Sequence, residues 1–310
     1  MGKSASARKL PGLEEMTGKI KLGLRNDFVA HYVFLRSQEA LKGLVCSMMS
    51  LDPSEVTDVQ VLNVINYGEY VDKEIILDIK VELNHREYID LEIQVYLDEN
   101  WEKRSLLYLS RTYNEGVGSG EDYSKLKPTT LITITDRNLG IKCEKRDPEF
   151  YARYGILNLK NHEKYSDLLA IKMLYLNNIG LATEDDIKEK RVYWAKMFKA
   201  TTWEEIKELA RSGEAFMEAA KELYNANIIS EERTVMEAHQ RYIDVRDGQK
   251  AYYERVIREK DSALAAKDAT LAEKEAALAE KEAALAEKEA ALAGKDTIIS
   301  QLRKELKQLQ

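Results

Sequence analysis

Two short segments of alternating apolar and polar residues constrain the fold of this chain more than any other feature. They cover residues 75–83 and 88–96, and the polar tripeptide Asn84-His85-Arg86 separates them. Such alternation is typical of half-buried strands, and a short polar connection between two of them predicts an antiparallel hairpin. If Asp78 faces Glu92, the aliphatic side chains of both segments fall on one face. A shift by one residue would mix the two faces, so the pattern specifies the register.

The polar face of this hairpin carries acids in positions that suit a metal ion. It holds Asp78, Lys80, Asp90, Glu92 and Gln94, and in this register Asp78 stands directly opposite Glu92. Like charges in that arrangement destabilise a sheet, and a divalent cation with oxygen ligands would relieve the repulsion. The alternative is a solvated face on which Lys80 neutralises Asp90, because antiparallel sheets commonly expose one face. The hairpin pattern alone leaves both interpretations open.

Composition excludes several classes of protein. A length of 310 residues accommodates two domains, or one domain with an appendage. The formal net charge of −7 excludes a globally basic nucleic-acid binder, although not a local basic patch. The two cysteines, Cys46 and Cys143, suit a reducing compartment, and the histidines show no spacing typical of metal ligands. No signal-peptide core follows Met1 and no apolar run approaches transmembrane length, so we expect a cytoplasmic protein that does not engage a membrane.

The remaining apolar patterns predict an α/β core followed by a helical region. A flexible arm is expected over residues 1–18. Besides the hairpin, strands are expected over residues 59–64, 129–135 and 151–160. Helices are expected over residues 19–50, 102–113, 163–178, 185–199, 203–225 and 230–260, with a break near 225–229. In the helix of residues 102–113, the apolar stripe predicted to face the core is Leu106, Leu109 and Tyr113.

The C-terminal part of the chain is a tandem repeat with a period of seven. The sequence EKEAALA occurs three times in succession over residues 273–293, and one leucine recurs every seventh residue from Leu264 to Leu292. Its residue types favour a continuous helix. With leucine at heptad position a, lysine occupies position d, so the apolar seam is only half complete until the last two heptads. We expect a coiled coil over residues 256–310 that holds a homodimer or higher homo-oligomer, with a lone solvated helix as the alternative.

An ordered set of motifs runs along the α/β part. The motifs are Arg25-Asn-Asp27-Phe28 with Phe34, Leu77-Asp78-Ile79, Ile89-Asp-Leu-Glu92-Ile-Gln94-Val95, Arg104 with Tyr108, Ser110 and Tyr113, Gly120-x-x-Tyr123-x-x-Leu126-x-Pro128, and Leu131-Ile-Thr-Ile134. Together they resemble the Rpn family of recombination-promoting nucleases, which are transposase-like proteins of the PD-(D/E)XK nuclease superfamily. The likeness covers about residues 20–180 and excludes the repeats.

The resemblance implies a fold and a set of site residues. The fold would be a PD-(D/E)XK restriction-endonuclease-like α/β core over residues 19–180, a helical region over 181–255 and the coiled coil over 256–310. The catalytic residues would be Asp78, Glu92 and Gln94, the last standing where the wider superfamily carries lysine. The metal ligands would be Asp78, Glu92, the backbone carbonyl of Ile93 and, on the first core helix, Asp27. The implied cofactor is Mg²⁺ or another divalent cation such as Mn²⁺.

The implied function is metal-dependent hydrolysis of phosphodiester bonds in double-stranded DNA, either in recombination or on mobile or phage DNA. One alternative is a non-catalytic scaffold or binding protein that has a degenerate nuclease core and assembles through its coiled coil. Another is a transposase that also joins strands. The presence of Asp78, Glu92 and Gln94 argues against a degenerate core, and no separate strand-transfer motif is present.

Several other residues have two interpretations. Lys80 and Arg104 either contact phosphate or form ordinary ion pairs within the protein. We expect Tyr108, Tyr113 and Tyr123 to pack in or beside the core instead of stacking on bases. Among the later helices, the spacing around His239 matches no zinc-binding motif, so we exclude a metal site there.

Overall fold

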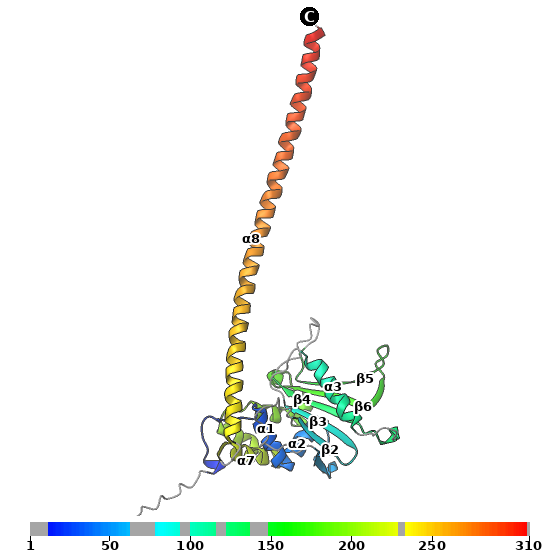
Figure 1. Ribbon diagram of the computed structural model, residues 1–310, viewed down its shortest axis with the longest axis vertical. Coiled ribbons are helices and arrows are strands. Elements are labelled where there is room, and N and C mark those ends of the chain that lie inside the picture. The colour runs from blue at the N-terminus through cyan, green and yellow to red at the C-terminus, as the bar shows by residue number, and fades with distance from the viewer. Residues whose placement is uncertain are drawn as a thin grey trace, which may run out of the picture. The chain divides into compact units, whose positions relative to one another are not determined.

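A computed structural model of the chain describes residues 12–62, 78–93, 100–115, 122–136, 148–228 and 233–308 (Figure 1). The expected catalytic residue Gln94 and the expected loop of residues 116–120 lie outside the described residues, and of Asp78 only the backbone is described. The chain divides into two units, Met1–Arg241 and Tyr242–Gln310. The first unit contains all the described strands.

In the described part of the chain, six strands form one mixed sheet in the order β1-β2-β3-β4-β6-β5. Strands β1 to β3 form an antiparallel meander, whereas β3, β4 and β6 run parallel and β5 returns antiparallel to β6. Their bounds are β1 Val59–Val61, β2 Asp78–Leu83, β3 Glu87–Ile93, β4 Thr129–Thr135, β5 Tyr151–Leu157 and β6 Lys164–Tyr175. The parallel pair β3 and β4 requires a crossover, and α3 (Trp101–Asn114) lies in that connection.

The hairpin predicted from the alternating pattern is confirmed together with its register. Asp78 pairs with Glu92, and Lys80 pairs with Asp90. The turn between the strands contains Asn84 and His85, whose φ angles of 50° and 54° lie in the left-handed region. Asparagine and histidine enter that region more readily than most residues, so the polar tripeptide suits the tight connection.

The aliphatic face of the sheet packs against a layer of helices. Ile79, Val81 and Leu91 from the sheet are fully buried in the same core as Phe34 and Trp194 from the helices, as expected if apolar burial drives the packing of the layers. Figure 1 shows α1, α2 and α7 grouped together beside the sheet. The helices of this layer are α1 Asp27–Arg36, α2 Gln38–Met49, α4 Glu184–Lys188, α5 Arg191–Lys199, α6 Trp203–Ala210 and α7 Glu214–Ile228.

The polar face of the hairpin is covered by α3, which packs against β3, β4 and β6. Asp90 and Glu92 are each only 1% exposed, so the solvated face considered from the sequence is wrong for these two acids. The expected stripe of α3 is wrong at Leu106, which is 57% exposed, whereas Leu109 is buried as expected. The buried residues of α3 are Trp101, Ser105, Leu109 and Thr112. Polar residues of this helix face the polar side of the sheet, so hydrophobicity alone could not identify its inner face.

Three other helix predictions need correction. The segment expected as a helix over residues 163–178 is strand β6, which pairs with both β4 and β5. The helix expected over residues 19–50 begins only at Asp27 and is divided at Ser37, whose side chain caps α2. The helix expected over residues 203–225 is divided into α6 and α7 around residues 211–213, and α7 ends at Ile228, inside the expected break of residues 225–229. Near this end, the buried side chain of Asn227 bonds the backbone N–H and C=O of Leu22 at 3.0 and 2.8 Å.

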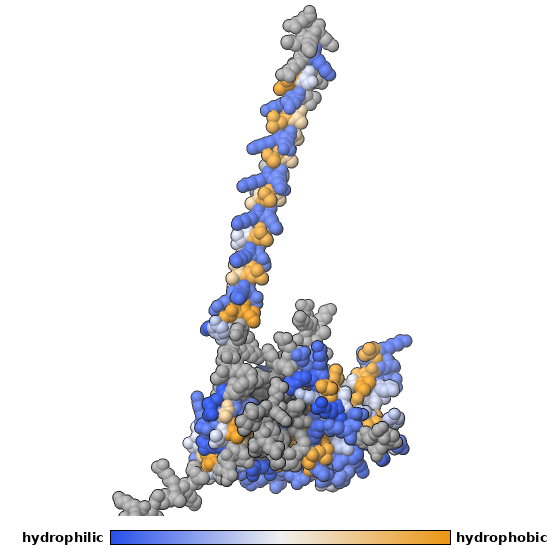
Figure 2. All heavy atoms as spheres, in the orientation of Figure 1, coloured by the Kyte–Doolittle hydropathy of each residue, from blue (hydrophilic) through white to orange (hydrophobic). Residues whose placement is uncertain are grey.

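The second unit consists of the outer part of α8 (Arg233–Gln308), a continuous helix as the repeat predicts. Apolar residues recur along it between charged ones (Figure 2). The leucines of the repeat, from Leu264 to Leu292, are 56–61% exposed. Among the helices that the structure describes, none is both long enough and apolar enough to span a membrane.

Candidate functional site

The ends of three strands meet at one edge of the sheet. Strands β3 and β4 run parallel, with Glu92 beside Thr133 and Ile93 beside Ile134 near their carboxyl ends. Strand β2 runs the opposite way and begins at this edge with Asp78, opposite Glu92. The backbone therefore brings Asp78, Glu92 and Ile93, three of the residues expected to bind a metal, to adjacent positions.

The amino end of α1 is held at the same edge. Arg25 forms an ion pair with Asp136, the residue that directly follows β4. Asp27 comes two residues after Arg25 and opens α1, whose cap is the side chain of Asn26, accepting a bond from the N–H of Val29 at 3.2 Å. This pair joins the segment that leads into α1 to the carboxyl end of β4. Asp136 was not among the residues expected at the site, although an acid directly after a predicted strand is a usable signal.

Burial beneath α3 sets the electrostatics of the acidic face. The hydroxyl of Thr112 on α3 donates to Oδ2 of Asp90 at 3.1 Å. Thr133, beside Glu92 on β4, is fully buried. Charges interact more strongly where water is excluded, so Asp90 and Glu92 lie in an environment that favours a compensating positive charge.

The two basic residues considered for phosphate contacts bond within the protein. The ammonium of Lys80 donates to both carboxylate oxygens of Glu115, at 3.0 and 3.2 Å. The guanidinium of Arg104 donates to the hydroxyl of Tyr108 at 2.9 Å and lies 5.7 Å from the ring centre of Trp101. The contact of Lys80 joins β2 to the end of α3, whereas the contacts of Arg104 lie within α3. Both support the interpretation that these residues make ordinary contacts within the protein.

The expected packing of the three tyrosines is confirmed for one of them and wrong for another. Tyr108 packs against a small buried cluster that includes Trp101 and Met173. Tyr113 is half-buried. Tyr123 is 81% exposed, because the short turn that carries it, Tyr123–Lys125, has no buried residue.

The donor set suits a hard divalent cation. Carboxylates from Asp78, Glu92 and Asp27, with the carbonyl of Ile93, offer only oxygen, which Mg²⁺ and Mn²⁺ prefer. Among the described side chains, no group of three or more His, Cys, Asp and Glu residues is gathered closely enough to hold a metal. A site built on Glu92 therefore depends on Asp78, whose side chain lies outside that set, and on water to complete the coordination.

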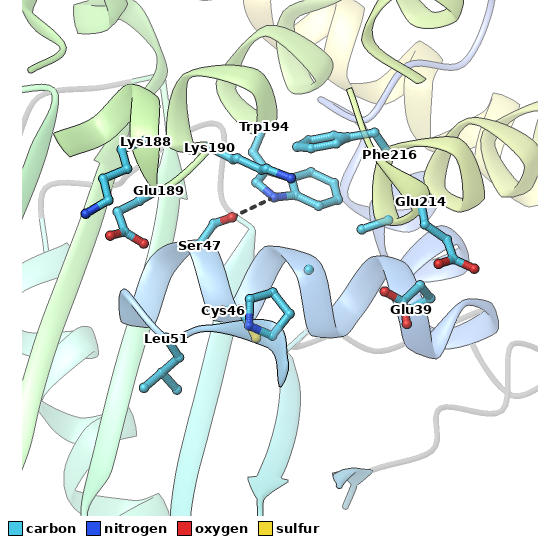
Figure 3. A pocket seen from close by; sticks show the side chains of 14 residues that line it. Glu39, Cys46, Ser47, Leu51, Lys188, Glu189, Lys190, Trp194, Glu214 and Phe216 are labelled. Carbon is cyan, nitrogen blue, oxygen red and sulfur yellow. Dashed lines mark hydrogen bonds between the residues drawn. The ribbon is translucent and has the colours of Figure 1, made fainter. Parts of the chain in front are cut away.

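A separate cavity of about 200 Å³ lies between α2 and the turns that precede α5 and α7 (Figure 3). Two of the residues that line it bond to each other: Nε1 of the buried Trp194 donates to the hydroxyl of Ser47 at 3.1 Å. Burial raises the pKa of Cys46, which also lines the cavity, to about 11. A thiol with such a pKa is protonated at neutral pH and is a poor nucleophile. None of the expected site residues lines this cavity, so we assign it no part in catalysis.

The start of α8 contacts the amino end of α1. Nε2 of His239 lies 2.5 Å from Oδ1 of Asp27, and its ring centre lies 4.4 Å from that of Phe28. The sequence analysis excluded His239 because its neighbours match no metal-binding motif. The two residues lie far apart in the chain, and no periodic pattern links them, so only the folded structure reveals the contact.

The chain matches a known protein family over most of its length. Residues 24–251 match the model of a family described as "PD-(D/E)XK nuclease family transposase". The matched range includes the hairpin, α3, β4 and the start of α8, and it ends before the heptad repeats. Neither a curated protein nor a solved structure matches the chain.

Proposed function

Because this chain belongs to the PD-(D/E)XK nuclease family transposases, we propose that it is a metal-dependent endonuclease that hydrolyses phosphodiester bonds in double-stranded DNA. Nucleases of this kind generally use divalent metal ions. The observation that carries the proposal is the pairing of Asp78 with Glu92 at the carboxyl edge of β3. The biological setting that we propose is recombination, or cleavage of mobile or phage DNA.

Each site residue has a proposed role. Asp78, Glu92 and the carbonyl of Ile93 would hold the cation, and Asp27 on α1 would be a further ligand. A bound divalent cation supplies Lewis acidity, which activates water and offsets charge on the scissile phosphate. Helix α3 excludes water from the acidic face, and Thr112 fixes Asp90 beside Glu92 through its bond to Oδ2 of Asp90.

At the position of Gln94 the wider superfamily carries lysine, so this chain has a neutral amide there in place of a positive charge. An amide can donate and accept hydrogen bonds, so Gln94 orients the attacking water or a phosphate oxygen, but it offsets no charge. We infer that the cation and its carboxylates supply more of the transition-state stabilisation here than in relatives with lysine. Mg²⁺ is the cation that we propose first, with Mn²⁺ as a substitute.

The test is cleavage of supercoiled plasmid with Mg²⁺ or with EDTA, using the full-length protein. Asp78→Asn, Glu92→Gln and Gln94→Ala should each lower the rate by at least tenfold, and EDTA should abolish cleavage. Glu102→Gln is the matched control, because Glu102 is an exposed residue of α3, and this variant should cleave like the wild type. Unchanged cleavage by Asp78→Asn and Glu92→Gln would refute the site. Product strands joined to one another, instead of simply cut, would identify a transposase.

We also propose that α8 joins two or more copies of the chain through residues 256–310. Exposed leucines at every seventh position support this proposal, because they would be buried in a coiled coil. A dimer would bring two nuclease sites to one duplex, which is a direct route to double-strand breaks. Light scattering coupled to gel filtration tests it, and a monomeric mass at micromolar concentration would refute it.

A further inference from the structure

We propose that His239, near the start of α8, is a positioning residue of the nuclease site and acts through the carboxylate of Asp27. The inference rests on the proposed function, since it concerns how a residue expected to approach the cation is held. Nothing in the sequence motifs assigns a role to His239. The contact between the two side chains, and the way in which the surrounding chain fixes it, carry the inference.

The geometry of the contact is close and two-sided. Nε2 of His239 lies 2.5 Å from Oδ1 of Asp27, and the two side chains are 22% and 34% exposed. The ring of His239 also packs on Phe28, with 4.4 Å between ring centres and 50° between their planes. Phe28 is 4% exposed and belongs to the main core. The imidazole is therefore confined between a buried ring and the carboxylate.

The backbone on both sides of this contact is fixed. The side-chain amide of Asn26 donates to the carbonyl of Met236 at 3.3 Å and to the side-chain oxygen of Gln240 at 3.1 Å. Met236 itself is fully buried in the main core. These bonds join the residue before Asp27 to residues on either side of His239. The fold thus imposes the contact, unlike a surface ion pair between two mobile side chains.

A second ion-pair group holds the same turn of α8. Glu237 accepts bonds from Lys21 at 2.7 Å and from Arg233 at 2.8 Å. Lys21 precedes α1, so this group is a further bridge between the segment before Asp27 and the start of α8. Each such partly exposed pair is worth little alone, but the bridges at Asn26 and Glu237 restrict motion of one segment against the other.

The contacts orient one particular oxygen of Asp27. Oδ1 receives the contact from His239 and also a bond from the N–H of Phe28 at 3.2 Å. Both contacts are made to the same oxygen, so Oδ2 is the oxygen that would bind the cation. The imidazole can donate from Nε2 in its charged form and in the neutral form that carries the proton there. A partner that orients a ligand in this way commonly changes metal affinity by tenfold or more when it is removed.

The family match places this contact inside the nuclease domain. It extends from residue 24 to residue 251 and so contains both Asp27 and His239. The heptad repeats begin later, so the contact is independent of the number of repeats. Asp27 and His239 belong to the same compact unit of the chain.

The test is Mn²⁺ binding by the full-length protein, measured by electron paramagnetic resonance, with folding checked by circular dichroism. His239→Leu removes the donor and should weaken Mn²⁺ binding about tenfold. His239→Gln keeps a donor and should recover much of that loss, which a purely structural role would not produce. The control is Thr234→Leu, since Thr234 is an exposed residue of the same helix, and this variant should bind like the wild type.

A double variant and a site variant separate the possible failures. If His239 acts through Asp27, then Asp27→Asn with His239→Leu should bind no more weakly than Asp27→Asn alone. Loss of Mn²⁺ binding in Glu92→Gln together with wild-type binding in His239→Leu would overturn this inference and leave the proposed function standing. Wild-type Mn²⁺ binding in Glu92→Gln would instead refute the proposed metal site. If His239→Leu does not fold, His239→Ala replaces it as the variant without the imidazole: weaker binding than in Thr234→Leu supports the inference, and equal binding overturns it.

Discussion

Replacing Glu92 with glutamine should make the metal-free protein more stable while removing its response to Mg²⁺. Glu92 is 1% exposed, lies opposite Asp78 and shares its face of β3 with the equally buried Asp90. Without a cation, the charges of Asp90 and Glu92 repel each other in a region from which water is excluded. Glutamine has almost the same shape as glutamate but no charge, so the substitution removes repulsion without creating a cavity.

The magnitude follows from the spacing of the strand. Residues two apart on one face of a strand are separated by about 7 Å. Two like charges at that distance repel by about 2 kcal/mol at an effective dielectric constant of about 20. The bond from Thr112 to Asp90 and the position of Lys80 opposite Asp90 offset part of this repulsion. We therefore expect Glu92→Gln to raise the free energy of unfolding in EDTA by about 1–2 kcal/mol.

The assay is urea unfolding followed by tryptophan fluorescence, because Trp101, Trp194 and Trp203 are all buried in the first unit. Mg²⁺ at about a hundred times its dissociation constant should stabilise the wild type by about 2.7 kcal/mol. Glu92→Gln should gain far less. A loss of more than about 1 kcal/mol for Glu92→Gln in EDTA would refute the reasoning, because it would mean that the carboxylate makes net favourable contacts in the absence of a cation.

Three further outcomes are expected away from this site. Burial lowers the pKa of Lys172 from 10.5 to about 8, so the folded state loses this proton more readily than the unfolded chain does. The unfolding free energy of the wild type, relative to that of Lys172→Met, should therefore rise by up to about 2–3 kcal/mol between pH 7 and pH 10. If urea titrations show the same difference between the two proteins at both pH values, this expectation is contradicted. Asp186→Asn should cost about 3 kcal/mol in the same assay, because Arg191, 3.0 Å away and 4% exposed, would keep a buried charge without its counterion; a cost under 1 kcal/mol would be inconsistent with a buried pair. Deleting residues 280–286, one copy of the repeat, should leave the number of chains per oligomer unchanged in light scattering, because a whole heptad is removed. Loss of oligomers would count against a seam that is continuous through the repeats.

The hairpin and its register could be predicted because the signal is local and one-sided. Alternation with a period of two fixes which residues face the core. Pairing Asp78 with Glu92 places the apolar residues of both strands on one face of the sheet and the polar residues on the other. The strand over residues 129–135 was predictable for a related reason, because its β-branched residues favour extended backbone. The positions of Asp78 and Glu92 opposite each other could therefore be predicted from these local patterns.

The remainder depends on tertiary packing that leaves no local pattern. Strand β6 contains an almost continuous apolar run, which suits a buried strand and a buried helix equally well. The inner face of α3 is partly polar because it meets Asp90 through Thr112. The partners of Asp27 and Asp136 come from distant segments, so no spacing along the chain could reveal the contact of His239 with Asp27 or that of Arg25 with Asp136.

The central claim is that the acids paired across β2 and β3 form a metal-dependent nuclease site. Its most direct test is the conversion of supercoiled plasmid to nicked or linear DNA by wild type and Glu92→Gln, purified in parallel and assayed with Mg²⁺ and with EDTA. The account predicts cleavage only by the wild type and only with Mg²⁺. Equal cleavage by the two proteins, or no cleavage by a folded wild-type protein with either Mg²⁺ or Mn²⁺, would contradict it.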